Sequence, residues 1–241
     1  MYETLLALLV AHLVADFPLQ PDWMIRRKRH PAVLGLHGLI VVGTAAFALG
    51  GWPSTLLLIL VGTHLAMDAV KVYLLKDSLR SFTVDQVVHL LVILGLALGF
   101  PGTYAQGWWA ALPGNFAAAY AIGLCLLGGV IASLMVGAIV IRKATMPFTG
   151  QLSGDISGLE SGGTYIGWLE RALVMLLILI GQPAGVGFLI TAKSILRFGD
   201  VRDSAQRKLT EYIIIGTFMS FGWGLLIAVL TQLAMRHWMA P

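Results

Sequence analysis

Residues 53–75 read PSTLLLILVGTHLAMDAVKVYLL, an apolar run that follows Trp52 and is followed by Lys76. A transmembrane helix needs about 20 largely apolar residues, and its ends are marked by Pro, Gly, Trp or clustered charge. Seven more segments of the chain meet this description. The sequence therefore predicts an all-α, polytopic membrane helical bundle. Its eight spans are expected at about 3–20, 31–50, 53–75, 81–100, 115–141, 164–181, 184–199 and 208–235.

The composition excludes a soluble globular protein. Of the 241 residues, 58% are hydrophobic and only 12% are charged, and the mean hydropathy is +0.84. A soluble domain carries about 25% charged residues, so much of this surface must face membrane lipid, which is the expected partner. The net charge of +4 is confined to short segments, which argues against nucleic acid as a partner. A single cysteine, Cys125, excludes an intrachain disulfide and disfavours a Cu(I) or Fe–S site.

Basic residues gather in alternate connections between the expected spans. They are Arg26, Arg27, Lys28 and Arg29, then Lys76 and Arg80, then Arg142 and Lys143, and finally Arg202, Arg207 and Lys208. The opposite connections, 50–53, 101–114 and 181–183, carry no charge. Because short cytoplasmic loops collect Lys and Arg, both termini are expected outside. The RRKR cluster at 26–29 is then an orientation signal, with a lipid-headgroup or nucleic-acid patch as the alternative. The start, Met1-Tyr2-Glu3, lacks the basic region of a signal peptide, so the first span is expected to remain uncleaved as a membrane helix.

The first four spans contain eight ionisable groups, each of which costs about 2.5–3.5 kcal/mol inside a membrane helix. The groups are His12, Asp16, His37, His64, Asp68, Lys71, Asp85 and His89. In three of these spans a His and an Asp stand four residues apart, which places both side chains on one helix face. Counting about 1.5 Å per residue from the basic ends puts these His and Asp side chains in one band, roughly 6–16 Å deep. They are expected to meet at one site.

Imidazole and carboxylate together suit Zn, Mn or Fe. Four His and three Asp exceed the ligands of one tetrahedral zinc, so two ions are present or some Asp residues orient the His rings. The metal would activate water, with Asp16, Asp68 or Asp85 as general base. Lys71 would hold an anionic substrate group or, alternatively, pair with Asp68. The other interpretations of the cluster are a proton- or ion-conducting path, a structural hydrogen-bond network and a haem site.

Several segments of this set resemble a known family. The segment HLVADFPLQ at 12–20, His37, the His64-xxx-Asp68-xx-Lys71 spacing and Asp85-Gln86-xx-His89 are similar to the uncharacterised bacterial membrane family known as domain of unknown function 3307. Segments 167–171, 192–198 and 211–217 are similar to the C-terminal motifs of its longer members. The resemblance implies a multi-pass protein of the bacterial inner membrane but no activity. A weaker similarity to membrane-bound metal-dependent hydrolases implies a hydrolase.

The later spans contain a second set of charges, whose signs nearly balance. They are Glu170, Arg171, Lys193, Arg197 and Glu211. We expect Glu170 to pair with Lys193 and Glu211 with Arg197, because opposite charges on adjacent helices make an intramembrane charge tolerable. The alternative is that Arg171, Lys193 and Arg197 bind the headgroup of a phospholipid or polyprenyl phosphate.

Two halves are therefore expected: a four-helix His/Asp half at 1–100 and a four-helix half at 101–241. The second half contains a long cytoplasmic connection at 142–163 with Asp155 and Glu160, which is a lid or simply a mobile loop. Small residues in the fifth span are expected to allow close helix packing. These are Gly123, Gly128, Gly129, Ala132 and Gly137. The leading hypothesis is an intramembrane metal-dependent hydrolase of a lipid or lipid-linked (phospho)ester. A proton- or divalent-ion-coupled transporter or channel is the runner-up, and a non-catalytic scaffold is the third.

Overall fold

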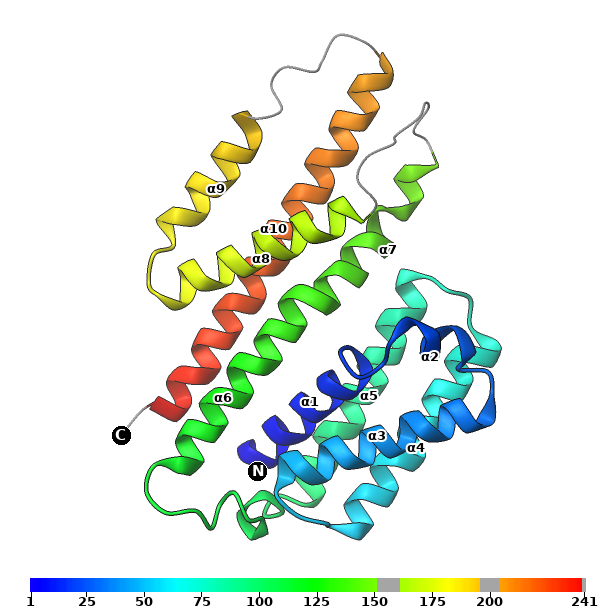
Figure 1. Cartoon of the computed structure of the whole chain (residues 1–241), viewed down its shortest axis with the longest axis vertical. Coiled ribbons are helices and arrows are strands. Elements are labelled where there is room, and N and C mark those ends of the chain that lie inside the picture. The colour runs from blue at the N-terminus through cyan, green and yellow to red at the C-terminus, as the bar shows by residue number, and fades with distance from the viewer. Residues whose placement is uncertain (151–160, 196–203, 240–241) are drawn as a thin grey trace. The chain divides into compact units, whose positions relative to one another are not determined.

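The computed structural model describes residues 1–150, 161–195 and 204–239, and within them it is helical, with no strand (Figure 1). The first helices are α1 (Tyr2–Asp16), α2 (Asp22–Arg27), α3 (Pro31–Leu49), α4 (Ser54–Leu74) and α5 (Leu79–Gly99). After a 3-10 turn (Tyr104–Gln106) come α6 (Phe116–Ile131), a π-helical segment (Ala132–Val136) and α7 (Gly137–Thr149). The last helices are α8 (Gly162–Leu179), α9 (Ala184–Ile195) and α10 (Ser204–Met239).

Six helical stretches in the described part of the chain are long and apolar enough to cross a membrane. They are Pro31–Leu49, Ser54–Leu74, Leu79–Gly99, Phe116–Thr149, Gly162–Leu179 and Arg207–Met239. The predicted all-helical class is therefore confirmed for the described residues, and the six stretches agree with a multi-pass membrane protein. α1 and α9 are shorter, with 15 and 12 residues. α1 ends at Asp16, just before Pro18, which has no backbone N–H and so cannot continue the helical hydrogen bonds.

Two connections differ from the prediction. The fifth predicted span does not end at 141, because helix continues without a break from Phe116 to Thr149 and includes Arg142 and Lys143. The first connection contains a short helix, α2, for which no helix was predicted. The predicted 142–163 connection is helical in its described residues up to Thr149 and from Gly162, and its residues 151–160, with Asp155 and Glu160, lie outside the described part of the chain.

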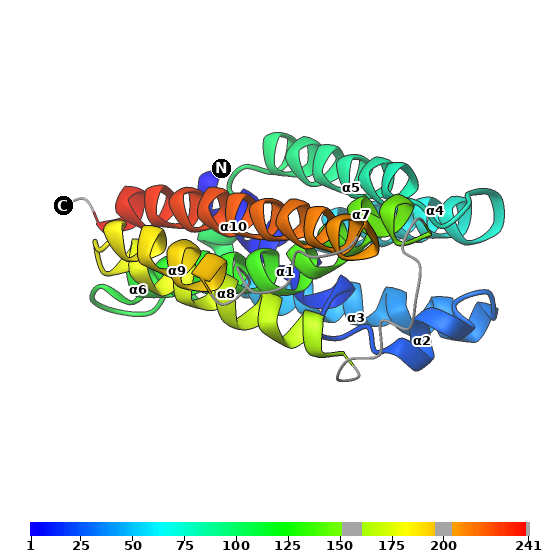
Figure 2. The ribbon, with the colours of Figure 1, turned by 90° about the horizontal axis from the view of Figure 1, so that it is seen from above.

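Contacts divide the chain into two compact units, Met1–Ile131 with Ala234–Pro241, and Ala132–Leu233. In the first unit α1 packs against α3, α5 and α6, and α4 packs against α3 and α5. Figure 2 shows α4 and α5 lying next to each other. One side of α1 is buried through Thr4, Ala7, Leu8, Ala11 and Ala15, whose spacing of three or four residues defines a helix face. The small alanines let neighbouring helices approach closely.

The connection after α5 is held against the end of α3 by its backbone. Gly50 ends α3 with φ 71°, a conformation that favours glycine. Gly107 lies against this turn so closely that a β-carbon there would overlap the Leu49 carbonyl oxygen. Trp108 N donates to Gly50 O at 2.7 Å, and Trp109 Nε1 donates to Phe47 O at 2.6 Å.

The second unit is built around the π-helical segment. A π-turn leaves carbonyl groups without their usual helical donors, and side chains supply replacements. Trp223 Nε1 donates to Ala132 O at 2.9 Å, and Arg171 Nη2 donates to Leu134 O at 3.1 Å. Gly137 makes room for both donors, since a β-carbon there would lie 2.7 Å from Trp223 Cδ1 and 3.0 Å from Arg171 Nε. The close packing expected at Gly137 is confirmed, whereas Gly123 has open space around its Cα.

Candidate metal centre

Four helices of the first unit bring the seven His and Asp side chains into one buried cluster. α1 contributes His12 and Asp16, α3 contributes His37, α4 contributes His64 and Asp68, and α5 contributes Asp85 and His89. The four imidazoles, Asp68 and Asp85 are buried, and Asp16 is nearly so. The helical spacing read from the sequence is what aims them inward, because residues four apart share a face.

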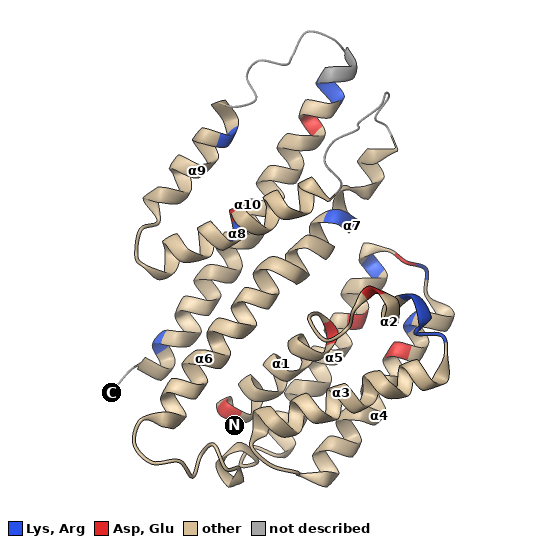
Figure 3. Cartoon of the chain, in the orientation of Figure 1, with Lys and Arg blue, Asp and Glu red and all other residues tan. Residues whose placement is uncertain are grey.

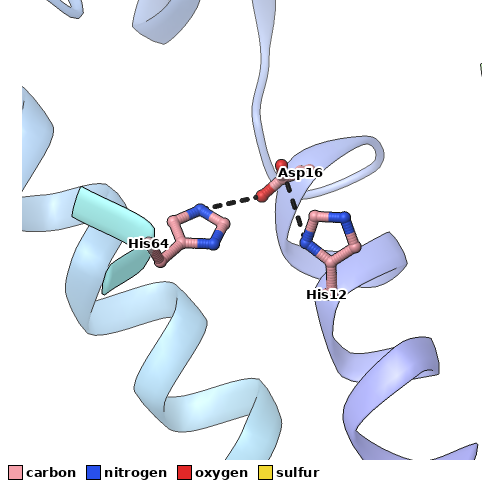
Figure 4. A group of neighbouring side chains, drawn as sticks. All are labelled: His12, Asp16 and His64. Atoms are coloured by element: carbon pink, nitrogen blue, oxygen red, sulfur yellow. Dashed lines mark ion pairs between the residues drawn. The ribbon is translucent and has the colours of Figure 1, made fainter. Parts of the chain in front are cut away.

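Three ligand atoms form a compact triangle at the centre of the cluster. His37 Nε2 and His64 Nε2 are 3.1 Å apart, and Asp16 Oδ1 lies 3.3 Å from the first and 3.2 Å from the second. Figure 4 shows the Asp16 carboxylate between His64 and His12, whose Nδ1 is 3.7 Å from Asp16 Oδ2. Zinc bound at about 2.0–2.1 Å in a tetrahedron separates its ligand atoms by roughly 3.3 Å. The triangle therefore has the dimensions of one face of a zinc site.

Asp68 completes a second triangle on the same His37–His64 edge. Its Oδ2 lies 3.4 Å from His37 Nε2 and 3.5 Å from His64 Nε2. Asp68, Asp85 and His89 form a third group, whose ligand atoms all lie within 4.8 Å of one another. Since neighbouring groups share His64 or Asp68, the arrangement accommodates one ion with four ligands or two ions with a shared ligand.

Several polar atoms of the cluster are buried without a hydrogen bond in the described structure. They are His12 Nδ1, Asp16 Oδ1, Asp85 Oδ1 and His89 Nε2, together with Asp68 Oδ2, which lies 2.8 Å from Lys28 Nζ as an ion pair without hydrogen-bond geometry. A buried polar atom without a hydrogen bond costs about 1–3 kcal/mol, and buried charges are normally paired or bound to a metal. The donor set of imidazole nitrogen and carboxylate oxygen fits a divalent transition metal.

Two lysines reach the carboxylates, and one of them was not expected. Lys28, which follows α2 and is 6% exposed, places Nζ 2.8 Å from Asp68 Oδ2. The interpretation of 26–29 as only an orientation signal is therefore incomplete. Lys71 Nζ lies 2.6 Å from Asp85 Oδ2, so the expected alternative pairing of Lys71 with Asp68 is wrong. Figure 3 shows charged residues of this unit gathered around α2 and the nearby ends of α1, α4 and α5. The exceptions are Glu3 in the first turn of α1 and Arg236 in the last turn of α10.

Two glutamines also belong to the site and were not singled out as site residues from the sequence. Gln20 Nε2 lies 3.1 Å from His37 Nδ1. Gln86 Oε1 lies 3.3 Å from His12 Nε2, and Gln86 Nε2 donates to Asp85 Oδ2 at 3.1 Å. Gln20 stands four residues after Asp16, and Gln86 directly follows Asp85. Both lie inside the segments that resemble the family, and this proximity to an Asp is the signal that identifies them. Gln86 Oε1 can only accept, so it places the proton on His12 Nε2 and leaves Nδ1 free. His37 Nε2 is free to bind a metal when the Gln20 amide turns its oxygen, and not its nitrogen, to Nδ1.

The imidazole rings form a continuous series. His64 and His89 are stacked, with ring centroids 4.1 Å apart at an interplanar angle of 23°. His37 lies 5.1 Å from His64 on one side, and His12 lies 5.1 Å from His89 on the other. The cluster therefore connects α3 to α1 through side chains of α4 and α5.

The comparisons with known proteins address the part of the chain that carries this cluster. Residues 4–109 match the family described as a protein of unknown function (DUF3307). The resemblance drawn from the motifs is thereby confirmed for this part, which includes every residue of the cluster. The DUF3307 match ends before 167–171, so the similarity expected for the C-terminal motifs stays a prediction. No curated protein and no solved structure matches the chain.

The second set of charges is arranged in part as expected. Lys193 Nζ lies 2.6 Å from Glu170 Oε1, the expected pair. Glu211 pairs with Arg207 at 3.1 Å on the exposed side of α10, and Arg197, its expected partner, lies outside the described residues. Arg171 is 2% exposed and donates from Nη1 to Ser220 Oγ at 2.9 Å, besides its bond to the π-helical segment.

Proposed function

We propose that the protein is an intramembrane metal-dependent hydrolase whose substrate is a lipid or a lipid-linked ester or phosphoester. The observation that carries this proposal is the triangle of His37 Nε2, His64 Nε2 and Asp16 Oδ1, with atoms 3.1–3.3 Å apart. Zinc suits these donors best, and Mn or Fe is the alternative. One ion would use this triangle with Asp68, and a second would use Asp85 and His89.

The charge of the cluster supports a cation. Three carboxylates face two ammonium groups, Lys28 and Lys71, so the cluster is formally negative by one charge while its imidazoles are neutral. A divalent ion would reverse that sign and attract an anionic substrate group. Lys71, whose side chain is 33% exposed, is the cluster cation placed to contact such a group from outside.

The positions of the carboxylates suggest separate roles. Asp16 and Asp68 direct an oxygen at His37 and His64 and would serve as ligands. Asp85 lies outside both triangles, with Oδ1 3.4 Å from His89 Nε2 and Oδ2 held by Lys71. With one ion bound, Asp85 would serve as the general base. A bound metal would lower the pKa of water and supply the nucleophile. Asp85 would accept the water proton and return it to the leaving alcohol as the ester C–O or P–O bond breaks.

A second function, proton or divalent-ion transport, is favoured by the continuous series of imidazoles from His37 to His12. Neighbouring rings at these distances suit a proton relay. Proton or zinc flux into proteoliposomes that disappears in both His12→Gln and His89→Gln would favour transport over hydrolysis.

We also propose eight spans with both termini outside the cytoplasm of a bacterial inner membrane. In this topology α1 and α9 act as short spans, accommodated by tilt or by burial in protein. The support is the alternation of basic and uncharged connections along the sequence.

Metal analysis tests the proposed hydrolase. Protein purified without added metal is expected to contain roughly one or two equivalents of Zn, Mn or Fe per chain. His64→Ala should lose most of this metal, because His64 belongs to both triangles. His237→Ala, which removes an exposed imidazole at the end of α10, should keep it. Less than about a tenth of an equivalent, unchanged by His64→Ala or by added zinc, would remove the basis of the proposal.

A further inference from the structure

A cavity lined by both polar and apolar residues lies between α7, α8 and α10 of the second unit. Its volume is about 480 Å³, and its lining includes Arg142, Thr145, Gly163, Gly167, Arg171 and Tyr212. A smaller cavity of about 190 Å³ shares most of these residues. Neither belongs to the His/Asp cluster, which lies in the other unit.

Arg171 places a buried positive charge at this cavity. Its guanidinium has five N–H donors in a planar fork, and its two hydrogen bonds go to Ser220 Oγ and Leu134 O. Nε has no hydrogen-bond partner in the described structure. The guanidinium packs over Gly167, where a β-carbon would lie 3.0 Å from Nη1. Because Gly167 is one turn nearer the start of α8, the charge is directed toward the N-terminal end of that helix.

Among the residues that the structure describes, the lining of this cavity contains two arginines and no carboxylate. Arg142 is exposed and lines it, and no carboxylate of the described chain lies within ion-pair distance of Arg142 or Arg171. Glu170 is adjacent to Arg171 in sequence, but it pairs with Lys193. Gly162 and Gly163 add the first turn of α8, where free backbone N–H groups and the helix dipole favour an anion.

We propose that this cavity binds an oxyanion of the phosphate class, either a soluble phosphate or the phosphate of a lipid headgroup. Arg171 and Arg142 would contact the anion from the inner end and the rim, and the first turn of α8 would contribute backbone N–H groups. Lys193, considered for this role from the sequence, is neutralised by Glu170 and takes no part. The proposal does not depend on the metal centre.

Ligand-induced stabilisation of the full-length protein in detergent tests the site. The probes are inorganic phosphate and dioctanoyl phosphatidic acid, with dioctanoylglycerol as the lipid that lacks only the phosphate. Affinity is read from the rise in Tm along each titration. Arg142→Gln removes an exposed charge, and Arg80→Gln, on α5, is its matched control. Gly163→Leu fills the cavity where a β-carbon meets nothing within 4 Å, and Gly187→Leu in α9 is its control.

Arg142→Gln is expected to weaken phosphate-dependent binding roughly 10- to 100-fold, the loss of one charge-assisted contact. Gly163→Leu should abolish binding, and both controls should bind like the unaltered protein. A response to inorganic phosphate identifies a site for soluble anions, and a response to phosphatidic acid alone identifies a headgroup site. No response to either, an equal response to dioctanoylglycerol, or full binding in both Arg142→Gln and Gly163→Leu would overturn the proposal.

Discussion

Lys28 Nζ lies 2.8 Å from Asp68 Oδ2, and that same oxygen faces His37 Nε2 and His64 Nε2. This lysine directly follows the short helix α2, whose Met24 is buried, and the next residue, Arg29, accepts a hydrogen bond at its backbone oxygen from the Tyr73 hydroxyl of α4. An ammonium group and a metal ion would therefore act on one carboxylate oxygen. The basic segment after α1 supplies a counter-charge to the cluster as well as a topology signal.

Lys28→Met should destabilise the metal-free protein, because Asp68 would keep a buried charge without its partner. Breaking a buried ion pair costs about 3–5 kcal/mol. Zinc should recover much of this loss, since an ion that binds the native state at 100 times its Kd adds about 2.7 kcal/mol. Thermal unfolding in detergent, with EDTA or with excess zinc, measures both effects. Arg26→Gln removes an exposed charge from α2 and should change neither value. An equal loss of Tm in both conditions would show that zinc does not act on Asp68.

Asp16→Asn and Asp85→Asn should separate a metal ligand from a proton acceptor. Asp16 belongs to the central triangle, so its amide variant should weaken the tighter metal site by more than the roughly 10- to 100-fold caused by removing an outer partner. Asp85→Asn should leave that site intact and, with one metal per chain, abolish only turnover. Competition with a chromophoric chelator measures the affinity. The role assignment fails when both variants lose the first metal equally, or when Asp16→Asn keeps it unchanged.

The convergence of the cluster could be predicted because it depends on helical periodicity. A spacing of four places His64 and Asp68 on one face of α4, and Asp85 and His89 on one face of α5. Once four apolar helices are assigned, depth counting brings these faces to one level. Such reasoning needs only the sequence and the rise of a helix.

The remaining contacts depend on features that periodicity does not specify. Lys28 and Gln20 enter the cluster from the segment between α1 and α3, whose path is set by how α2 folds back. Lys71 stands three residues after Asp68 and could have paired with it. Because α4 packs against α5, Lys71 instead forms an ion pair with Asp85. Arg142 was taken to follow the end of a span, but charge marks where a helix leaves the apolar layer and not where it ends.

Gly137→Ala and Gly123→Ala, both in the helical stretch Phe116–Thr149, should have opposite effects. At Gly137 the new methyl group would meet Trp223 at 2.7 Å and displace its hydrogen bond to Ala132 O, a strain of about 1–3 kcal/mol. At Gly123 it meets nothing within 4 Å, and the gain in helix propensity is up to about 1 kcal/mol. Thermal unfolding of the two variants gives the comparison. Equal stability of the two variants would show that Trp223 can move away from residue 137 without destabilising the π-helical segment.

Single-cysteine labelling should show that α5 crosses the membrane with its Lys76 end inside. The one native cysteine, Cys125, is buried, so a Cys125→Ala background is expected to fold and to remain unlabelled. Lys76→Cys and Gln106→Cys place exposed thiols beyond the two ends of a helix of 21 residues, roughly 30 Å long. An impermeant maleimide added to spheroplasts should label only Gln106→Cys, and lysis should make Lys76→Cys equally reactive. Labelling of Lys76→Cys alone would invert the topology, and labelling of both in intact spheroplasts would mean that α5 does not cross. Either outcome would also move the basic segment with Lys28 to the outer face, against the rule that short basic connections stay in the cytoplasm.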